Sequence, residues 1–214
     1  MYRKDKQDKE IEERATSRPQ RPAPMPREWQ DDIRQAVEVM NRGGIILYPT
    51  DTVWGLGCDA TNDDAVRRIF ALKQRAEAKA MISLVDSEAK VAFYVREVPD
   101  PAWDLIALSE RPLTIVYDGA RNLAPSLIAD DGSVALRVTR ERFSNHLCMR
   151  MRRAVVSTSA NISGQPSPRC FSEIAPEVIA GVDYVCSSRR DEKNPAASSI
   201  IKLGAGCEVK IIRE

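Results

Sequence analysis

The chain has 214 residues, 43% of them hydrophobic and 29% charged, with a formal net charge of +1. This balance fits one globular domain with a substantial core, and it marks neither nucleic acid nor a membrane as a partner. No run approaches the roughly 20 apolar residues of a membrane span, and no signal peptide is visible. The five cysteines include no CxxC pair, so we expect a reduced, cytoplasmic protein without a disulfide framework or structural zinc.

Residues 1–27 differ in composition from the rest of the chain. They are charged at first and then rich in proline and arginine over residues 18–24. Such a segment buries too little apolar surface to fold alone. We therefore predict a flexible arm over residues 1–27, for which RNA contact is one role, followed by a folded domain over residues 28–214.

Apolar spacing and end signals predict the first elements of this domain. Apolar residues recur at helical spacing over residues 29–40, and Gly43-Gly44 is typical of a helix end. A short apolar strand follows at 45–48. Asn62 is a good N-cap for the next helix, and residues 81–85 indicate a second strand.

Strands and helices continue to alternate toward the C-terminus. Further strands are expected at 113–117, 134–138, 155–156, 199–203 and 209–212, and helices at 86–95, 101–109, 140–152 and 172–180. This alternation predicts an α/β domain in which helices cover a largely buried sheet.

A polar loop follows directly on the first predicted strand. Residues 49–57 read Pro-Thr-Asp-Thr-Val-Trp-Gly-Leu-Gly, and ligands tend to bind where strands of an α/β sheet end. Thr50 and Thr52 can donate hydrogen bonds to an anion or a small polar ligand, and the glycines permit close backbone approach. The alternative is an ordinary polar turn, and composition alone does not decide.

Three further segments carry groups that suit anions. Residues 73–75 read Lys-Gln-Arg, with Lys79 just beyond, and form either a phosphate clamp or a solvated helix end. Residues 157–164 combine small hydroxylated side chains with Asn161, and form either a nucleotide contact or a turn. Arg137 lies inside a predicted strand, where it either faces solvent or meets an anion in a cleft.

Familiar phosphate-binding patterns are absent or misplaced. GxxxxGK[ST] does not occur, which excludes a P-loop enzyme. Residues 55–60 fit G-x-G-x-x-A, but residues 49–54 separate them from the preceding strand, which argues against a dinucleotide site. His146 is the single histidine, so a multi-histidine metal site cannot form.

Taken together and in order, five segments resemble the YrdC-like threonylcarbamoyl-adenylate synthase family over residues 30–213. They are Pro49-Thr50-Asp51-Thr52 running into Gly55-Leu56-Gly57, Lys73-x-Arg75, Pro112-Leu113-Thr114, Arg137, and Ser159-Ala160-Asn161. The resemblance implies an α/β fold with an open, twisted, mixed sheet, flanked by helices around a large concave cleft. It also implies a nucleotidyltransferase that makes threonylcarbamoyl-AMP and pyrophosphate from L-threonine, bicarbonate and ATP, for the threonylcarbamoyladenosine modification of tRNA.

The resemblance assigns roles to individual residues of the catalytic domain. In-line attack of a carboxylated threonine on the α-phosphate needs positioning and charge neutralisation, so no protein nucleophile is assigned and magnesium is expected to share the charge. Because Lys73 ends a predicted helix, we expect Lys73→Ala to weaken ATP use and leave the fold intact. The residues expected at ATP are Lys73, Arg75, Thr114, Ser159, Asn161 and Ser198; those expected at threonine are Thr50 and Arg137; other cleft residues are Thr52, Lys79 and Arg213.

Some features depart from the family pattern. Glu110-Arg111-Pro112 stands where the family often has Pro-Gly-Pro, and Ala196-Ala197 replaces the glycine usual before Ser198. The chain resembles the short form, without the extra C-terminal domain of longer members. The expected partners are the three substrates, tRNA and the proteins that transfer the threonylcarbamoyl group.

Two alternatives to a synthase are considered. A non-catalytic RNA-binding protein could use the same scaffold with its basic cleft, although scattered aromatic residues, 6% of the chain, provide no stacking platform. The second alternative is a carbamoyl-transfer role, like that of YrdC-like domains in hydrogenase maturation. Those domains usually belong to longer chains with zinc-finger cysteine motifs, which this sequence lacks.

Overall fold

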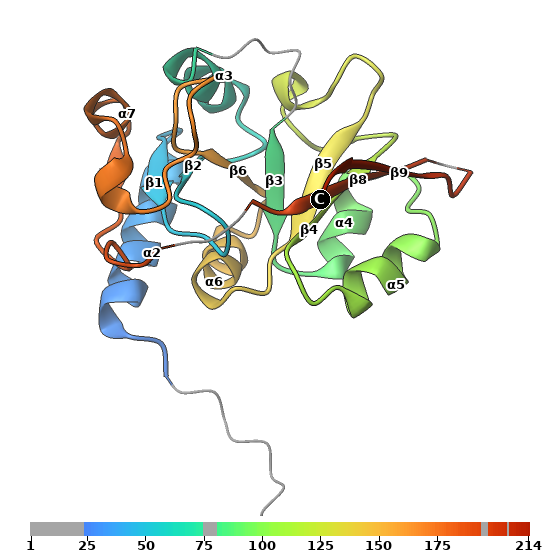
Figure 1. The fold of residues 1–214 in the computed structure, drawn as a ribbon, viewed down its shortest axis with the longest axis horizontal. Coiled ribbons are helices and arrows are strands. Elements are labelled where there is room, and N and C mark those ends of the chain that lie inside the picture. The colour runs from blue at the N-terminus through green and yellow to red at the C-terminus, as the bar shows by residue number, and fades with distance from the viewer. Residues whose placement is uncertain (1–23, 75–80, 194–196, 205) are drawn as a thin grey trace, which may run out of the picture.

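The structure is a computed structural model that describes residues 24–74, 81–193, 197–204 and 206–214. The labels of its elements are those of Figure 1. The helices are α2 (Arg27–Asn41), α3 (Asp63–Leu72), α4 (Glu88–Tyr94), α5 (Pro101–Leu108), α6 (Arg142–Met151) and α7 (Pro176–Ala180), with 3-10 turns over Pro125–Leu127 and Phe171–Glu173. The strands are β1 (Ile46–Tyr48), β2 (Gly55–Gly57), β3 (Ile82–Val85), β4 (Leu113–Tyr117), β5 (Val134–Val138), β6 (Val155–Ser159), β7 (Tyr184–Val185), β8 (Ser199–Leu203) and β9 (Val209–Arg213).

Within the described residues, the strands form one nine-stranded sheet in the order β7-β1-β2-β6-β3-β5-β4-β8-β9. The pairs β1–β7, β3–β5 and β4–β8 are parallel, and the other pairs are antiparallel. Helices pack around this sheet, with α6, α4 and α5 along the lower edge of the view and α3 at the top (Figure 1). The predicted fold class, an α/β protein with a mixed sheet flanked by helices, is therefore confirmed.

The end signals seen in the sequence act as predicted. Gly43 has a φ of +79°, and its N–H bonds the carbonyl of Met40 at 3.0 Å, which ends α2 with a glycine in the left-handed region. The side chain of Asn62 accepts a hydrogen bond from the N–H of Ala65 at 3.0 Å and caps α3.

Three parts of the secondary structure differ from the prediction. The end of the loop 49–57 forms β2, because its backbone pairs with both β1 and β6. Its glycines allow this close pairing, since a Cβ at Gly57 would lie 2.7 Å from the Tyr48 ring. The two-residue strand β7 was not predicted, and the helix expected at 172–180 is split into a 3-10 turn and α7. Of the predicted arm, residues 1–23 lie outside the described residues, and α2 begins at Arg27.

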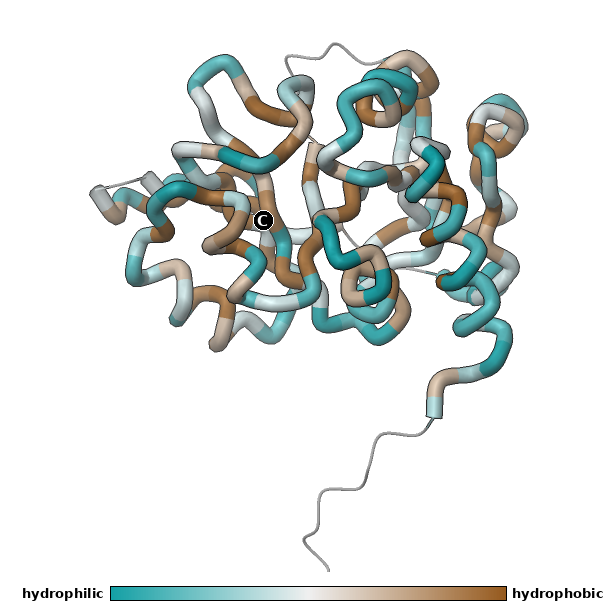
Figure 2. Tube along the Cα trace, turned by 180° about the vertical axis from the view of Figure 1, so that it is seen from behind, coloured by the Kyte–Doolittle hydropathy of each residue, from teal (hydrophilic) through white to brown (hydrophobic). Residues whose placement is uncertain are grey.

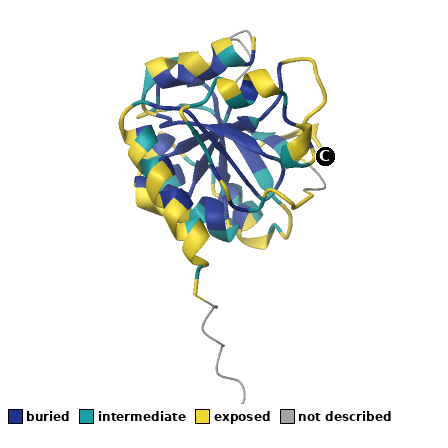
Figure 3. Cartoon of the chain, turned by 90° about the vertical axis from the view of Figure 1, so that its left-hand side faces the viewer, coloured by how far each residue is buried: buried dark blue, intermediate teal, exposed yellow. Residues whose placement is uncertain are grey.

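The core lies along the strands and beneath the inner faces of the helices. All three residues of β1 are fully buried, as expected for a strand that is covered on both faces. Figure 3 shows the central strands as buried and the outer helix faces as exposed, and Figure 2 shows hydrophobic segments gathered inside. The edge strand β9 is different, because all five of its residues are exposed. The α2 helix packs on α6, where the rings of Trp29 and Phe143 meet edge to face at 5.8 Å.

Candidate active site

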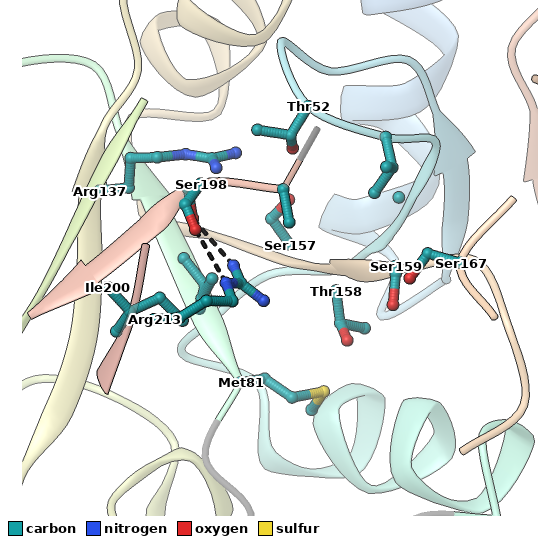
Figure 4. Close-up of a pocket in the computed structure, with 14 residues that line it drawn as sticks. Thr52, Met81, Arg137, Ser157, Thr158, Ser159, Ser167, Ser198, Ile200 and Arg213 are labelled. Atoms are coloured by element: carbon teal, nitrogen blue, oxygen red, sulfur yellow. Dashed lines mark hydrogen bonds between the residues drawn. The ribbon is translucent and has the colours of Figure 1, made fainter. Parts of the chain in front are cut away.

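A cavity of about 180 Å³ opens between the central strands and the C-terminal hairpin β8–β9. Figure 4 shows hydroxyl side chains of β6 along this cavity and the guanidinium groups of Arg137 and Arg213 beside it. The predicted residues that line it are Thr52, Arg137, Ser159, Ser198 and Arg213. The other lining residues are Val53, Gly55, Met81, Ile82, Ser157, Thr158, Ser167, Ala197 and Ile200.

Two arginines give the cavity its charge. The side chain of Arg137 is only 3% exposed, and its Nη2 lies 3.0 Å from the Asp51 carboxylate. Arg213 donates to the carbonyl of Ser198 at 2.9 Å and to its hydroxyl at 3.3 Å, and has no carboxylate partner among the described residues. Burial lowers the pKa of Arg213, and the like charge of Arg137 lowers it further. Two like charges at one cavity favour a bound anion.

The hydroxyl of Thr50 organises the loop between β1 and β2. Its Oγ1 donates to the carbonyl of Val53 at 2.7 Å and accepts from the N–H of Thr52 at 3.0 Å. These local bonds satisfy the backbone where no strand partner is present. Thr50 is 1% exposed and lies behind the cavity wall, whereas Thr52 lines the cavity. The position of Thr52 and Val53 in the cavity lining favours the ligand-site interpretation of this loop.

Lys73 joins α3 to the loop that follows β6. It is the C-cap of α3 and is 1% exposed. Its ammonium donates to the carbonyl of Ser159, and at 2.7 Å to the carbonyl of Asn161. The same loop is closed by a 2.5 Å hydrogen bond from the Ser159 hydroxyl to Asn161 Oδ1. For Lys73, the alternative of a solvated helix end is wrong.

The remaining predicted residues lie in the same region where the structure describes them. Thr114 of β4 is buried, and its Oγ1 lies 2.9 Å from Oγ of Ser198. Because Ser198 also binds Arg213, this pair fixes the wall of the cavity on the side of β8 and β9. Arg75 and Lys79 lie outside the described residues.

Several charged groups near the site have roles that sequence reasoning missed. Asp51 belongs to the loop motif but had no role assigned from the sequence, and in the structure it is the partner of Arg137. Burial raises the pKa of Asp51, although the charge of Arg137 acts in the opposite direction. The need of an arginine inside a strand for a partner was a signal at Arg137, but it did not point to Asp51. Glu141 and Arg189, which pair at 3.1 Å, had no such signal.

A second cavity, of about 350 Å³, lies next to the first. It is lined by Glu110, Arg111 and Pro112, the segment that departs from the family pattern, and also by Asp51. Because Asp51 faces this cavity and Arg137 faces the first, their ion pair lies between the two.

Among the described residues, no group of three or more His, Cys, Asp or Glu side chains is placed to hold a metal ion. No helix in that part of the chain has the length and apolar character needed to cross a membrane.

Comparisons with known proteins place the chain in a family. The Sua5/YciO/YrdC family model, described as telomere recombination, matches residues 38–214. A threonylcarbamoyl-AMP synthase of Pseudoalteromonas translucida is 34% identical over 158 residues, which cover 72% of this chain and 84% of that protein. The chain therefore belongs to the Sua5/YciO/YrdC family.

Solved structures agree with this assignment. The crystal structure of P. abyssi Sua5 complexed with L-threonine is 26% identical with a TM-score of 0.74, over 84% of this chain and 52% of that one. The chain thus spans about half the length of that protein. The crystal structure of E. coli YciO, which is 22% identical, shares the fold with a TM-score of 0.76, over 89% of this chain and 91% of that one.

Proposed function

We propose that this chain is a threonylcarbamoyl-AMP synthase, a nucleotidyltransferase that uses L-threonine, bicarbonate and ATP. The observation that carries the proposal is the cavity in which Arg137 and Arg213 face a row of hydroxyl groups from β6. Such a site suits phosphate and carboxylate groups. The similarity to synthases over most of their length supports the same activity. It does not support the alternative of a non-catalytic RNA-binding protein.

We assign the two ends of the cleft to different substrates. Arg137 pairs with Asp51, the residue that follows Thr50, and it receives the carboxylate of threonine. Arg213 and Ser198 lie on the opposite side with Thr114 and contact the nucleotide. Lys73 holds the loop that presents Ser159 and Asn161 to ATP, and Arg75 is assigned to the phosphates by family resemblance. Thr52 and Lys79 complete the set of cleft residues.

The reaction requires positioning and charge neutralisation. The amine of threonine combines with bicarbonate, water leaves, and an oxygen of the new carbamate attacks the α-phosphorus of ATP. The bond to the β-phosphate oxygen breaks and pyrophosphate departs. The arginines neutralise the charge of the phosphates and hydroxyl donors orient them, so that no protein nucleophile takes part. Magnesium would accompany the ATP phosphates, because Mg²⁺ is often held by substrate phosphates and waters with few protein ligands.

The product is an activated carbamate, so the proposal extends to its use. A transfer reaction must carry the threonylcarbamoyl group to an adenosine of tRNA, and transfer proteins and tRNA are the proposed partners. We propose that this takes place in the cytoplasm, in keeping with the five free cysteines.

One assay tests the proposed function. The protein is incubated with ATP, magnesium and bicarbonate, with and without L-threonine, and pyrophosphate is measured together with the mass of the nucleotide product. We expect pyrophosphate release that depends on threonine, and an equal amount of threonylcarbamoyl-AMP. Release of pyrophosphate at the same rate without threonine, or no release at all, would contradict the proposal.

A further inference from the structure

A largely buried arginine side chain lies behind the loop between β1 and β2, outside the lining of either cavity. Arg189 follows β7, and its side chain is 9% exposed. Its Nη2 donates to the carbonyl of Thr50 at 3.3 Å. Its other nitrogens pair with two carboxylates, Nη1 with Glu141 at 3.1 Å and Nε with Glu192 at 2.7 Å. One planar guanidinium therefore joins its own segment, through Glu192, to two distant ones, at Thr50 and Glu141.

The backbone at Arg189 is held in a strained conformation. Its φ is +62°, in the left-handed region that side-chain-bearing residues seldom adopt. The preceding residues are fixed by the buried carboxylate of Asp32, which accepts from the N–H groups of Ser187 at 3.0 Å and Ser188 at 2.7 Å. The guanidinium lies 5.5 Å from the centre of the Trp29 ring. Local strain that the surroundings maintain in this way is common at functional sites.

The carbonyl that Arg189 binds belongs to the peptide between Thr50 and Asp51. On one side of this peptide, the Thr50 hydroxyl organises the loop. On the other side, the Asp51 carboxylate pairs with Arg137, which faces the cavity. A change in the tilt of this peptide moves both groups together. The contact of Arg189 therefore lies one residue away from the ion pair that orients Arg137.

We propose that Arg189 is a positioning residue, which holds the Thr50–Asp51 peptide so that Arg137 is oriented for the carboxylate of the amino-acid substrate. This inference rests on the proposed function for the identity of that substrate. It assigns Arg189 to the threonine side of the site, since no contact joins Arg189 to Arg213 or Ser198 within the described residues. Loss of the guanidinium should then weaken threonine use and spare ATP use.

The test compares Arg189→Met with Arg190→Met. Arg190 is the adjacent, exposed arginine of the same loop, and its guanidinium stacks on the Phe171 ring at 4.4 Å. We expect Arg189→Met to raise the KM for threonine about tenfold, the effect of losing ~1.4 kcal/mol of binding, with the KM for ATP changed less than about twofold. Arg190→Met should change neither. Arg189→Lys should restore part of the loss, because lysine still donates to the carbonyl but lacks the fork that pairs two carboxylates.

A second readout does not depend on activity. Hydrogen exchange at the amides of Thr52 and Val53 should be faster in Arg189→Met than in Arg190→Met. If Arg189→Met folds poorly, Arg189→Gly takes its place, because glycine accepts the left-handed backbone without strain.

The outcomes separate the two proposals. Absence of threonine-dependent pyrophosphate release from the unmodified protein would overturn the proposed function, and the exchange rates would still decide whether Arg189 holds the loop. An active protein in which the Arg189 and Arg190 variants have the same threonine KM and the same exchange rates would overturn the role of Arg189. An equal rise in the KM for ATP and for threonine would also overturn it, by showing a general loss of structure.

Discussion

Replacing Lys73 by methionine tests the link between α3 and the loop after β6. Methionine keeps an unbranched side chain and loses the ammonium. In the structure this ammonium donates to the carbonyls of Ser159 and Asn161, and Lys73 is 1% exposed. Hydrogen bonds that involve a charged group contribute about 1.5–3 kcal/mol each. The burial cost of the ammonium disappears in the variant and offsets part of the loss. We therefore expect the free energy of unfolding to fall by about 3 kcal/mol.

For a domain of this size, a loss of 1 kcal/mol lowers Tm by about 2–4 °C. Lys73→Met should therefore lower Tm by about 6–12 °C, as measured by circular dichroism during heating. Lys90→Met is the matched control, because Lys90 is only partly buried and its ammonium bonds a single carbonyl, that of Arg152, at 2.8 Å. The control should shift Tm by less than about 3 °C. A Lys73→Met protein as stable as the control would refute the reasoning. The structure thus replaces the expectation that substitution of Lys73 leaves the fold intact.

Two other predictions follow from the charged groups. Arg213→Gln removes a cation that has no carboxylate partner in the described residues. The KM for ATP should therefore rise about tenfold in the pyrophosphate assay. An unchanged KM for ATP would show that Arg213 does not belong to the nucleotide site. Burial raises the pKa of Asp32, but hydrogen bonds from Ser188, Tyr184 and Ser187 lower it to a net value below the usual range. Such a carboxyl stabilises the fold above its unfolded pKa of about 3.9, and this contribution is lost as the pH falls below it. The free energy of unfolding in urea should therefore fall more steeply below about pH 4 in the unmodified protein than in Asp32→Asn. The exposed neighbour variant Asp31→Asn should keep the steep slope, and equal slopes in all three proteins would contradict the role of Asp32.

The sequence was most informative where a signal acts within a few residues. The N-cap at Asn62 and the left-handed glycine at Gly43 are local in this sense, and both lie where they were predicted. The central longer strands β4, β5 and β6 were found for the same reason, because continuous apolar runs indicate burial on both faces. The predicted strand β9 is different, since all five of its residues are exposed. The strands β2 and β7 were missed because each has three residues or fewer and depends on distant partners for its hydrogen bonds.

The sequence predicted which residues gather at the candidate site, but it did not predict which of them pair with one another. The motif residues were identified from their order along the chain, and those that the structure describes gather at one cavity or directly behind it. Nothing local in the sequence marks Asp51 as the partner of Arg137, since the two residues are far apart in the chain. The burial of Lys73 was also hidden, because a lysine at a helix end is usually solvated.

The sequence by itself determined the family, the mixed α/β class and several of the polar residues that line the cavity, because these depend on periodicity and on the order of motifs. Only the tertiary structure decided which charges are paired and which face the cavity. Arg189 illustrates the difference, since its partners Thr50 and Glu141 come from two distant segments, whereas Glu192 lies only three residues along the chain. Folding brings the distant segments to Arg189, and the burial of the Arg189–Glu141 pair makes that pairing matter, because an unpaired charge away from water is costly.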